Sequence, residues 1–107
     1  MDRRRDVGIA GERVAELFLT ARGAKVLGRN LAVDGGEIDL VVTAGGVLTA
    51  VEVRSSTGAL EFGILFPATK LTRVKRLART AGCRRVDLVA VGFSRDAVTV
   101  RWFPDVR

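Results

Sequence analysis

The sequence predicts an α/β fold in which a mixed β-sheet is flanked by helices, with the elements in the order αβββαββ. Two stretches repeat apolar residues at helical spacing, and other stretches are rich in Val, Leu and Ile. The second helical stretch separates the third strand from the fourth, and strands on both sides of a helix favour a mixed sheet with helices packed on it. A chain of 107 residues is long enough for one domain, 1–107, and too short for two.

The first half of the chain is expected to contain one helix and three strands. Apolar residues recur at helical spacing over residues 7–22, and Gly23 follows as a C-cap. The strands are expected at residues 26–33, 37–43 and 47–54. Gly45 and Gly46 lie between the second and third strands, where a tight hairpin turn favours glycine.

The second half is expected to contain a loop, a helix and two closing strands. Ser, Thr and Gly interrupt the apolar pattern over residues 55–66, which predicts the loop. Pro67 then opens a helix that runs to about Ala81, and Gly82 ends it. The closing strands are expected at residues 86–93 and 97–103.

Apolar residues occur on both faces of the predicted hairpin. One face is expected to carry Ile38, Leu40, Val42, Val51 and Val53. The other is expected to carry Val41, Leu48 and Ala50. We therefore expect other elements to cover both faces of the sheet, at least in part.

Composition excludes several function classes. With 18 Lys and Arg against 12 Asp and Glu, the net charge is +6, which favours a polyanionic partner. The chain has no His and no Tyr, so it has no Ser-His-Asp triad, no His-liganded zinc and no tyrosyl nucleophile. A single cysteine, Cys83, excludes an internal disulfide and is compatible with a reducing cytosol. No apolar run is long enough for a signal sequence or a membrane span, so we expect a cytoplasmic protein without membrane contact.

Acidic residues fall opposite one another on the predicted hairpin. With a two-residue glycine turn, Asp39 lies opposite Glu52 and Glu37 lies opposite Arg54, with all four side chains on one face. Like charges at paired positions destabilise a sheet, and part-buried charge costs several kcal/mol unless it is compensated. Two compensations are open: a cross-strand salt-bridge cluster that includes Arg54, or a divalent cation such as Mg²⁺, which takes carboxylate oxygens as ligands.

Two further groups of charged residues lie on the predicted helices. Glu12 and Glu16 are one helical turn apart, and either could face the sheet; the alternative is a solvated helix flank. The second helix and its exit carry basic residues with no acid between positions 70 and 85: Lys70, Arg73, Lys75, Arg76, Arg79, Arg84 and Arg85. This density favours contact with a phosphate backbone over a solvated polar face, which usually mixes charges.

Several short motifs follow one another along nearly the whole chain. They are Gly11-Glu12-x-x-Ala15-x-x-x-Leu19, Gly23, Arg29-Asn30, Gly36-Glu37-Ile38-Asp39-Leu40, Val51-Glu52-Val53-Arg54, Lys70 and Arg85-Val86-Asp87. In these motifs the chain resembles the YraN-like family, small bacterial proteins assigned to the restriction-endonuclease-like superfamily with its PD-(D/E)xK signature. It is also similar in layout to archaeal Holliday-junction resolvases. The resemblance implies a restriction-endonuclease-like fold.

The resemblance also implies a site and a cofactor. Glu12, Asp39 and Glu52 would hold one or two Mg²⁺ ions, with Mn²⁺ as a substitute, and the metal would activate water at a scissile phosphate. Arg54 stands at the family's lysine position, where its charge would stabilise the transition state. Arginine is a poor general base because it does not readily lose a proton, and Lys70 is a candidate substitute. DNA is the implied partner, with its backbone held by the second helix at Lys70, Arg73, Arg76 and Arg79.

Three classes of function follow. The first is a Mg²⁺-dependent DNA endonuclease or DNA-processing protein that hydrolyses phosphodiester bonds, in branched or single-stranded DNA, alone, as a homodimer or with a DNA-processing partner. The second is a catalytically impaired module that binds nucleic acid or a partner and retains the nuclease fold, with Arg54 neutralising the carboxylates. The third is a structural interaction protein that responds to neither metal nor DNA.

Overall fold

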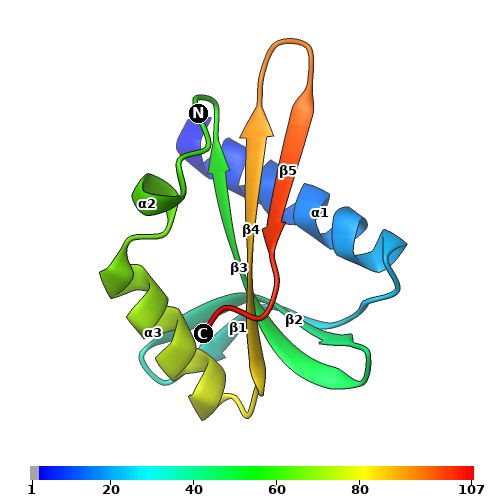
Figure 1. The fold of residues 1–107 in the computed structure, drawn as a ribbon, viewed down its shortest axis with the longest axis vertical. Coiled ribbons are helices and arrows are strands. Elements are labelled where there is room, and N and C mark those ends of the chain that lie inside the picture. The colour runs from blue at the N-terminus through cyan, green and yellow to red at the C-terminus, as the bar shows by residue number, and fades with distance from the viewer. Residues whose placement is uncertain (1–2) are drawn as a thin grey trace.

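A computed structural model describes residues 3–107; Met1 and Asp2, at the start of the predicted domain, lie outside the described residues. Figure 1 shows one sheet with strand order β1-β2-β3-β4-β5 and helices beside it. The elements are α1 (Arg3–Ala21), β1 (Lys25–Val33), β2 (Gly36–Ala44), β3 (Val47–Ser56), α2 (Phe62–Leu65), α3 (Ala68–Thr80), β4 (Arg85–Phe93) and β5 (Val98–Phe103).

The sheet is mixed. Strands β1 to β3 pair antiparallel, as do β4 and β5, whereas β3 and β4 are parallel. The parallel pair is joined by the crossover that contains α2 and α3, since parallel strands cannot be joined by a tight turn. The predicted α/β class and the order αβββαββ are confirmed. One prediction was incomplete, because the expected loop at 55–66 contains the single-turn helix α2.

The turn between β2 and β3 fixes their register. Gly45 and Gly46 have φ of 59° and 80°, the paired positive values of a type I′ hairpin turn, which matches the twist of the strands. The ladder runs from Ala44 opposite Val47 to Leu40 opposite Val51. The register predicted from this turn is confirmed over these pairs.

Ile38 lies in a different cluster from the one predicted. The sequence placed it with Leu40, but it packs with Val41 on the α3 side of the sheet. The β2–β3 ladder ends at Leu40, so the regular alternation of faces does not continue through Asp39 to Ile38.

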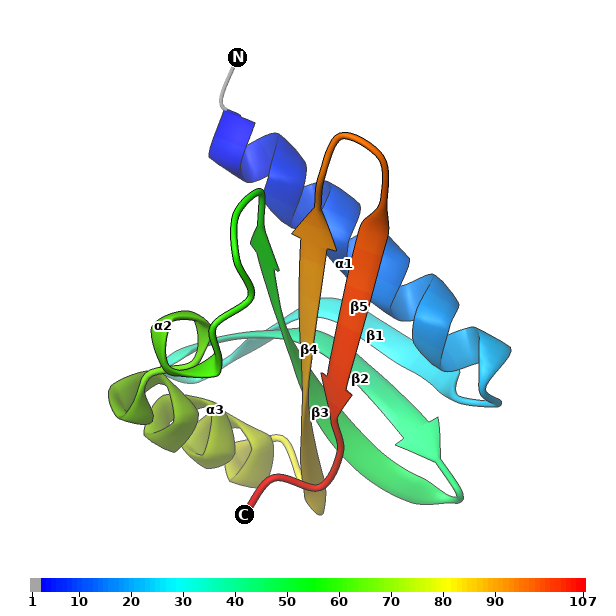
Figure 2. The ribbon, with the colours of Figure 1, turned by 45° about the horizontal axis from the view of Figure 1, so that its top comes forward.

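The two long helices cover opposite faces of the sheet (Figure 2). On the α1 side, the buried residues include Ala15, Leu19, Leu40, Val51 and Val89. On the α3 side, they include Val41, Ala50, Val74, Leu77 and Leu88. Both faces of the hairpin are therefore covered, as its two apolar faces predicted. Among the helices of residues 3–107, none combines the length and apolar character needed to cross a membrane.

Helix α1 begins at Arg3, before the predicted start at residue 7. Its first turn has no apolar residue in Arg3 to Asp6, so helical periodicity could not reveal it; the negative charge of Asp6 there suits the helix dipole. Further along, α1 lies close to β3: a Cβ atom placed on Gly11 would collide with the Ser55 side chain. This close approach holds the part of α1 that contains Glu12 against β3, the central strand of the sheet.

Candidate active site

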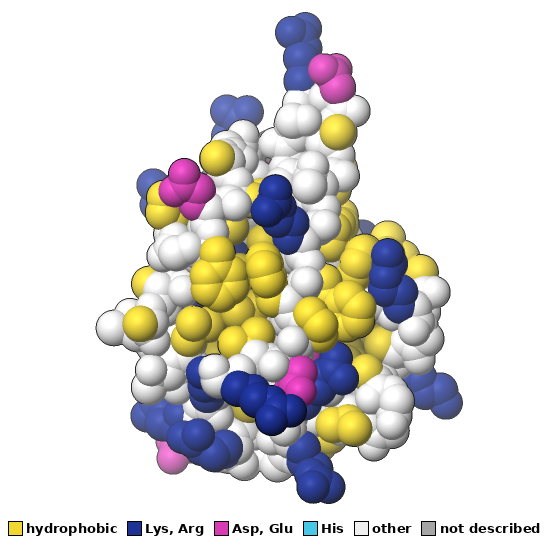
Figure 3. All heavy atoms as spheres, viewed as in Figure 1, with side chains coloured by type: hydrophobic (Ala, Val, Ile, Leu, Met, Phe, Trp, Pro, Cys, Tyr) yellow, Lys and Arg dark blue, Asp and Glu magenta, His cyan; other side chains and the backbone are white. Residues whose placement is uncertain are grey.

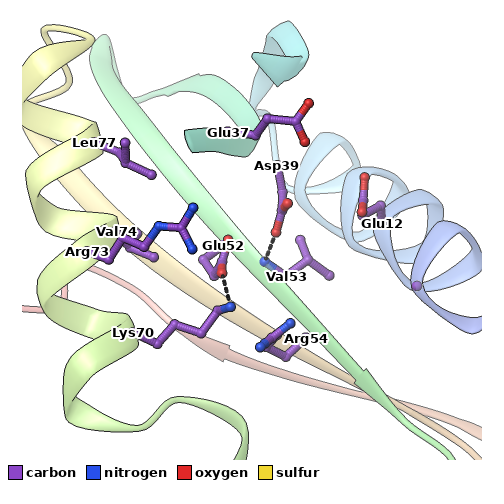
Figure 4. A pocket seen from close by; sticks show the side chains of 11 residues that line it. Glu12, Glu37, Asp39, Glu52, Val53, Arg54, Lys70, Arg73, Val74 and Leu77 are labelled. Carbon is purple, nitrogen blue, oxygen red and sulfur yellow. Dashed lines mark hydrogen bonds and ion pairs between the residues drawn. The ribbon is translucent and has the colours of Figure 1, made fainter. Parts of the chain in front are cut away.

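A hollow of about 280 Å³ lies where β2 and β3 separate, and residues of both α1 and α3 line it. We call it the acid hollow; its charged lining is Glu12, Glu37, Asp39, Glu52, Arg54, Lys70 and Arg73. Figure 4 shows Glu12 on α1 at one side, Lys70 and Arg73 on α3 at the other, and Asp39 and Glu52 on the strands between them. The structure thus brings together the three carboxylates that the family resemblance singles out, together with Arg54.

Asp39 is held by the neighbouring strand. Its Oδ2 atom accepts a hydrogen bond of 2.8 Å from the backbone N–H of Val53 (Figure 4). Asp39 and Glu52 were expected as a regular cross-strand pair, but the β2–β3 ladder stops one pair earlier, at Leu40 and Val51. The side chain of Asp39 therefore takes a backbone donor that β2 does not use, which fixes this carboxylate where the two strands separate.

Glu52 is buried, with 8% of its surface exposed. The nearest cation is Lys70, whose Nζ lies 3.5 Å from Glu52 Oε2. Burial, reinforced by the hydrogen-bonding and negative charge of Asp39, raises the pKa of Glu52 to about 8, although Lys70 and Arg54 act in the opposite direction. The positive charge that the chain supplies is therefore too small to offset the burial of this carboxylate.

Glu12 and Glu16 have different surroundings. Burial raises the pKa of Glu12, and the negative charges of Asp39 and Glu37 raise it further. One turn along, Glu16 accepts two hydrogen bonds of 2.7 Å from Arg29, and this pairing lowers the pKa of Glu16. Glu12 is thus the helix glutamate that faces the acid hollow, a choice that helical spacing alone left open.

The basic residues of α3 do not form one face. Lys70 and Arg73 line the acid hollow, whereas Arg79 lines a separate hollow at the other end of the helix. Arg79 is nine positions after Lys70, which is two and a half turns and places them on opposite sides of the helix.

Two arginines of α3 lie against the β1–β2 turn. Arg73 donates a hydrogen bond of 3.4 Å to the carbonyl oxygen of Gly35, and Arg76 lies beside the same residue. Of the four residues expected to hold DNA, Lys70 and Arg73 thus line the acid hollow, Arg76 lies beside the β1–β2 turn and Arg79 lines the separate hollow. Figure 3 shows Lys and Arg side chains gathered over α3 and the C-terminal end of the chain.

The acid hollow has the donor chemistry of a hard divalent cation site. Carboxylate oxygens are the ligands that Mg²⁺ takes, and a bound cation would offset the burial and the neighbouring negative charge that raise the pKa of Glu12 and Glu52. As the side chains stand in residues 3–107, however, no three acidic groups are close enough together to hold a metal ion. The residues therefore fit the cation chemically, and side chains in the hollow must turn to enclose it.

Gly8 also lines the acid hollow and was not singled out from the sequence. It lies inside α1, where glycine is unfavourable relative to alanine. Its position within a helical pattern was the signal from which the sequence could have indicated Gly8 as a functional position.

These features define an α/β protein with a mixed five-stranded sheet and a hollow in which carboxylates from a helix and two strands face cations from a second helix. The chain belongs to the family described as "Uncharacterised protein family UPF0102", whose model matches residues 11–91. This confirms the resemblance to the YraN-like family at the level of family membership.

Relatives in several bacteria match much of the chain. It is 44% identical over 77 residues to a UPF0102 protein of Symbiobacterium thermophilum, covering 72% of this chain and 64% of that protein. It is 37% identical over 106 residues to a UPF0102 protein of Pelotomaculum thermopropionicum, covering 89% of this chain and 88% of that protein. A Caulobacter vibrioides UPF0102 protein is 37% identical over 100 residues, covering 85% of this chain and 80% of its own length.

Proposed function

We propose that the protein is a Mg²⁺-dependent DNA endonuclease or DNA-processing nuclease that acts at the acid hollow, on branched or single-stranded DNA. The observation that carries this proposal is the convergence of Glu12, Asp39 and Glu52, from α1, β2 and β3, on one hollow. The resemblance of these positions to the PD-(D/E)xK signature supports the same chemistry.

The residues of the hollow have distinct proposed roles. Glu12, Asp39 and Glu52 would hold Mg²⁺ or Mn²⁺, which supplies Lewis-acid polarisation of the phosphate and lowers the pKa of bound water. Arg54 is exposed at the hollow, so its guanidinium group can donate paired hydrogen bonds to phosphate oxygens and stabilise charge that develops there. Lys70 adjoins Glu52 and brings a second positive charge from α3.

A second function is favoured by one observation. No three acidic groups of residues 3–107 are placed to hold a metal, and Lys70 and Arg54 already offset part of the charge of Glu52. Such an arrangement suits a module that binds DNA or a protein partner without catalysis. This alternative predicts salt-dependent DNA binding that metal does not change.

Cleavage assays distinguish the two functions. Labelled four-way, single-stranded and duplex DNA would be incubated with Mg²⁺, Mn²⁺ or EDTA and with the parent protein, Asp39→Asn or Glu52→Gln. We expect metal-dependent cleavage by the parent and a loss of about 100-fold or more in both variants. Glu16→Gln is the matched control, since this acid lies on α1 but pairs with Arg29 outside the acid hollow, and we expect it to cleave as the parent does.

Two results would contradict the nuclease proposal. One is equal cleavage by Asp39→Asn and the parent. The other is the absence of cleavage of every substrate by a parent protein that binds DNA, which would favour the binding module.

A further inference from the structure

A second hollow, of about 550 Å³, adjoins the acid hollow near the start of α1. We call it the arginine hollow; its lining includes Arg3, Arg4, Gly8, Arg54, Ser56 and Thr57. Among the residues that the structure describes, no acidic side chain lines it. Gly8 and Arg54 line both hollows, so carboxylates lie on one side of these two residues and guanidinium and hydroxyl groups lie on the other.

Within residues 3–107, neither backbone conformation nor close packing requires a glycine at position 8. Its φ is not among the positive values of the glycines, and a Cβ atom placed on it would meet no atom of residues 3–107 within 4 Å beyond its chain neighbours and the backbone of its own helix. Gly11, one turn later, differs because its Cβ would collide with Ser55. A glycine inside a helix costs about 0.5–1 kcal/mol relative to alanine. The space that Gly8 leaves open is therefore available to a ligand, at the point where the two hollows meet.

We infer that a nucleic-acid backbone crosses α1 at Gly8, with one phosphate in the acid hollow and a neighbouring phosphate in the arginine hollow. This inference rests on the proposed function and adds the path of the strand. Arg3 and Arg54 supply charge-assisted hydrogen bonds to phosphate, and the hydroxyls of Ser56 and Thr57 supply further donors. Gly8 lets the backbone lie close to the helix.

The chemistry of the two linings selects the sugar–phosphate backbone over the bases. No aromatic ring lines either hollow within residues 3–107, so neither offers a stacking platform for bases. Arginine and hydroxyl donors instead match phosphate oxygens. Binding along this path is therefore expected to depend weakly on sequence and strongly on salt.

The test measures binding separately from cleavage. Fluorescence anisotropy of a labelled single-stranded oligonucleotide would be followed in EDTA, so that the probe stays intact. Gly8→Leu fills the junction with a good helix-forming residue. Gly63→Leu is the matched control, because Gly63 is also helical and also has open space around a Cβ position.

We expect Gly8→Leu to weaken binding about tenfold or more, a loss of about 1.4 kcal/mol, without lowering the thermal midpoint, whereas Gly63→Leu binds as the parent does. Arg3→Gln/Arg4→Gln tests the same path by charge. It should lower the slope of log Kd against log salt by about one to two, as the loss of phosphate contacts predicts. Arg22→Gln/Lys25→Gln removes equal charge at the other end of α1 and should leave the slope unchanged.

The outcomes separate the strand path from the proposed function. If the parent binds the oligonucleotide and Gly8→Leu and Arg3→Gln/Arg4→Gln bind equally well, the path is wrong while the proposed function stands. If the parent does not bind nucleic acid at low salt, both are wrong. The path is supported if Gly8→Leu and Arg3→Gln/Arg4→Gln bind weakly while both control variants bind as the parent does.

Discussion

Asp87 on β4 and Glu52 on β3 are buried carboxylates on neighbouring parallel strands, but their partners differ. Asp87, 1% exposed, accepts two hydrogen bonds from Arg85, one from the Trp102 indole N–H and one from the backbone N–H of Asp105. Glu52 has one cation at 3.5 Å, Lys70, and another carboxylate beside it. Hydrogen bonds from the chain pair both carboxylate oxygens of Asp87, whereas Glu52 has too little positive charge around it. A buried carboxylate in that state is a candidate to bind a cation from outside the chain.

The difference also divides the family motifs by role. Arg85-Val86-Asp87 is part of the resemblance, yet Asp87 ties β4 to β5 and to the residues after it. Glu52 has the ion pair with Lys70 but no set of hydrogen bonds comparable to that of Asp87. The motifs that carry the family resemblance can therefore contain residues that hold the fold and residues that face the acid hollow, and hydrogen-bond partners distinguish them.

The largest expected effect is the loss of Asp87. Asp87→Ala leaves Arg85, the indole of Trp102 and one backbone N–H without an acceptor. We expect the free energy of unfolding to fall by about 3–5 kcal/mol, as for other broken buried ion pairs. Urea unfolding measures this, and the fluorescence of Trp102, the single tryptophan, reports on the lost hydrogen bond. A loss below about 1 kcal/mol would contradict a structural role.

Glu52→Gln, in contrast to Asp87→Ala, is expected to raise the free energy of unfolding. Without metal, the substitution removes a buried group that resists ionisation and keeps a side chain of the same shape. We expect the free energy of unfolding in EDTA at about pH 9 to rise by about 1 kcal/mol or more, since a pKa displaced by one corresponds to about 1.4 kcal/mol. Urea unfolding of parent and variant measures the difference. A variant less stable than the parent at this pH would mean that ionised Glu52 stabilises the fold.

The same pair of proteins should respond differently to pH. The pKa of Glu52 is about 8 in the fold against an ordinary value of 4.5, so between these values the folded state holds a proton that the unfolded state has released. The free energy of unfolding of the parent should therefore fall as pH rises through this window. Glu52→Gln lacks this fall, so its advantage in urea unfolding should grow from about pH 5 to about pH 9. An advantage that is constant with pH would contradict the raised pKa.

The smallest expected effect is that of Glu16→Gln. The pair of Glu16 with Arg29 has good geometry, with two hydrogen bonds of 2.7 Å, but the Arg29 side chain is 60% exposed. Exposed ion pairs contribute little because water and salt screen them. We expect the thermal midpoint to stay close to that of the parent at low and high salt. A fall in the thermal midpoint as large as that of Asp87→Ala would show that the exposure of an ion pair does not decide how much it stabilises this fold.

Much of the fold could be predicted from the sequence because its signals are local. The Gly45-Gly46 turn and the Val-rich flanks determine the hairpin register, and helical periodicity reveals α1 and α3. The single turn of α2 has no periodicity to detect. The first turn of α1 has no apolar residue, so its start was missed.

The site could be predicted only in part, because its details depend on where pairing stops. Period-two alternation places Asp39 and Glu52 on one side of the hairpin, and both line the acid hollow. The hydrogen bond from Val53 to Asp39 and the displacement of Ile38 arise from the end of the β2–β3 ladder, which no local pattern marks. The positions of the α3 cations could have been predicted, since a spacing of nine positions from Lys70 to Arg79 already implies opposite sides of a helix.

The central claim, that the carboxylates of the acid hollow hold a divalent cation, is tested most directly by titrating Mn²⁺ and Mg²⁺ into the parent protein and Asp39→Asn while following thermal unfolding. Asparagine keeps an oxygen acceptor for the Val53 N–H but removes the charge. We expect metal to raise the thermal midpoint of the parent by mass action, and to raise that of Asp39→Asn far less. No shift in either protein, with Asp39→Asn more stable than the parent through relief of repulsion, would contradict the claim.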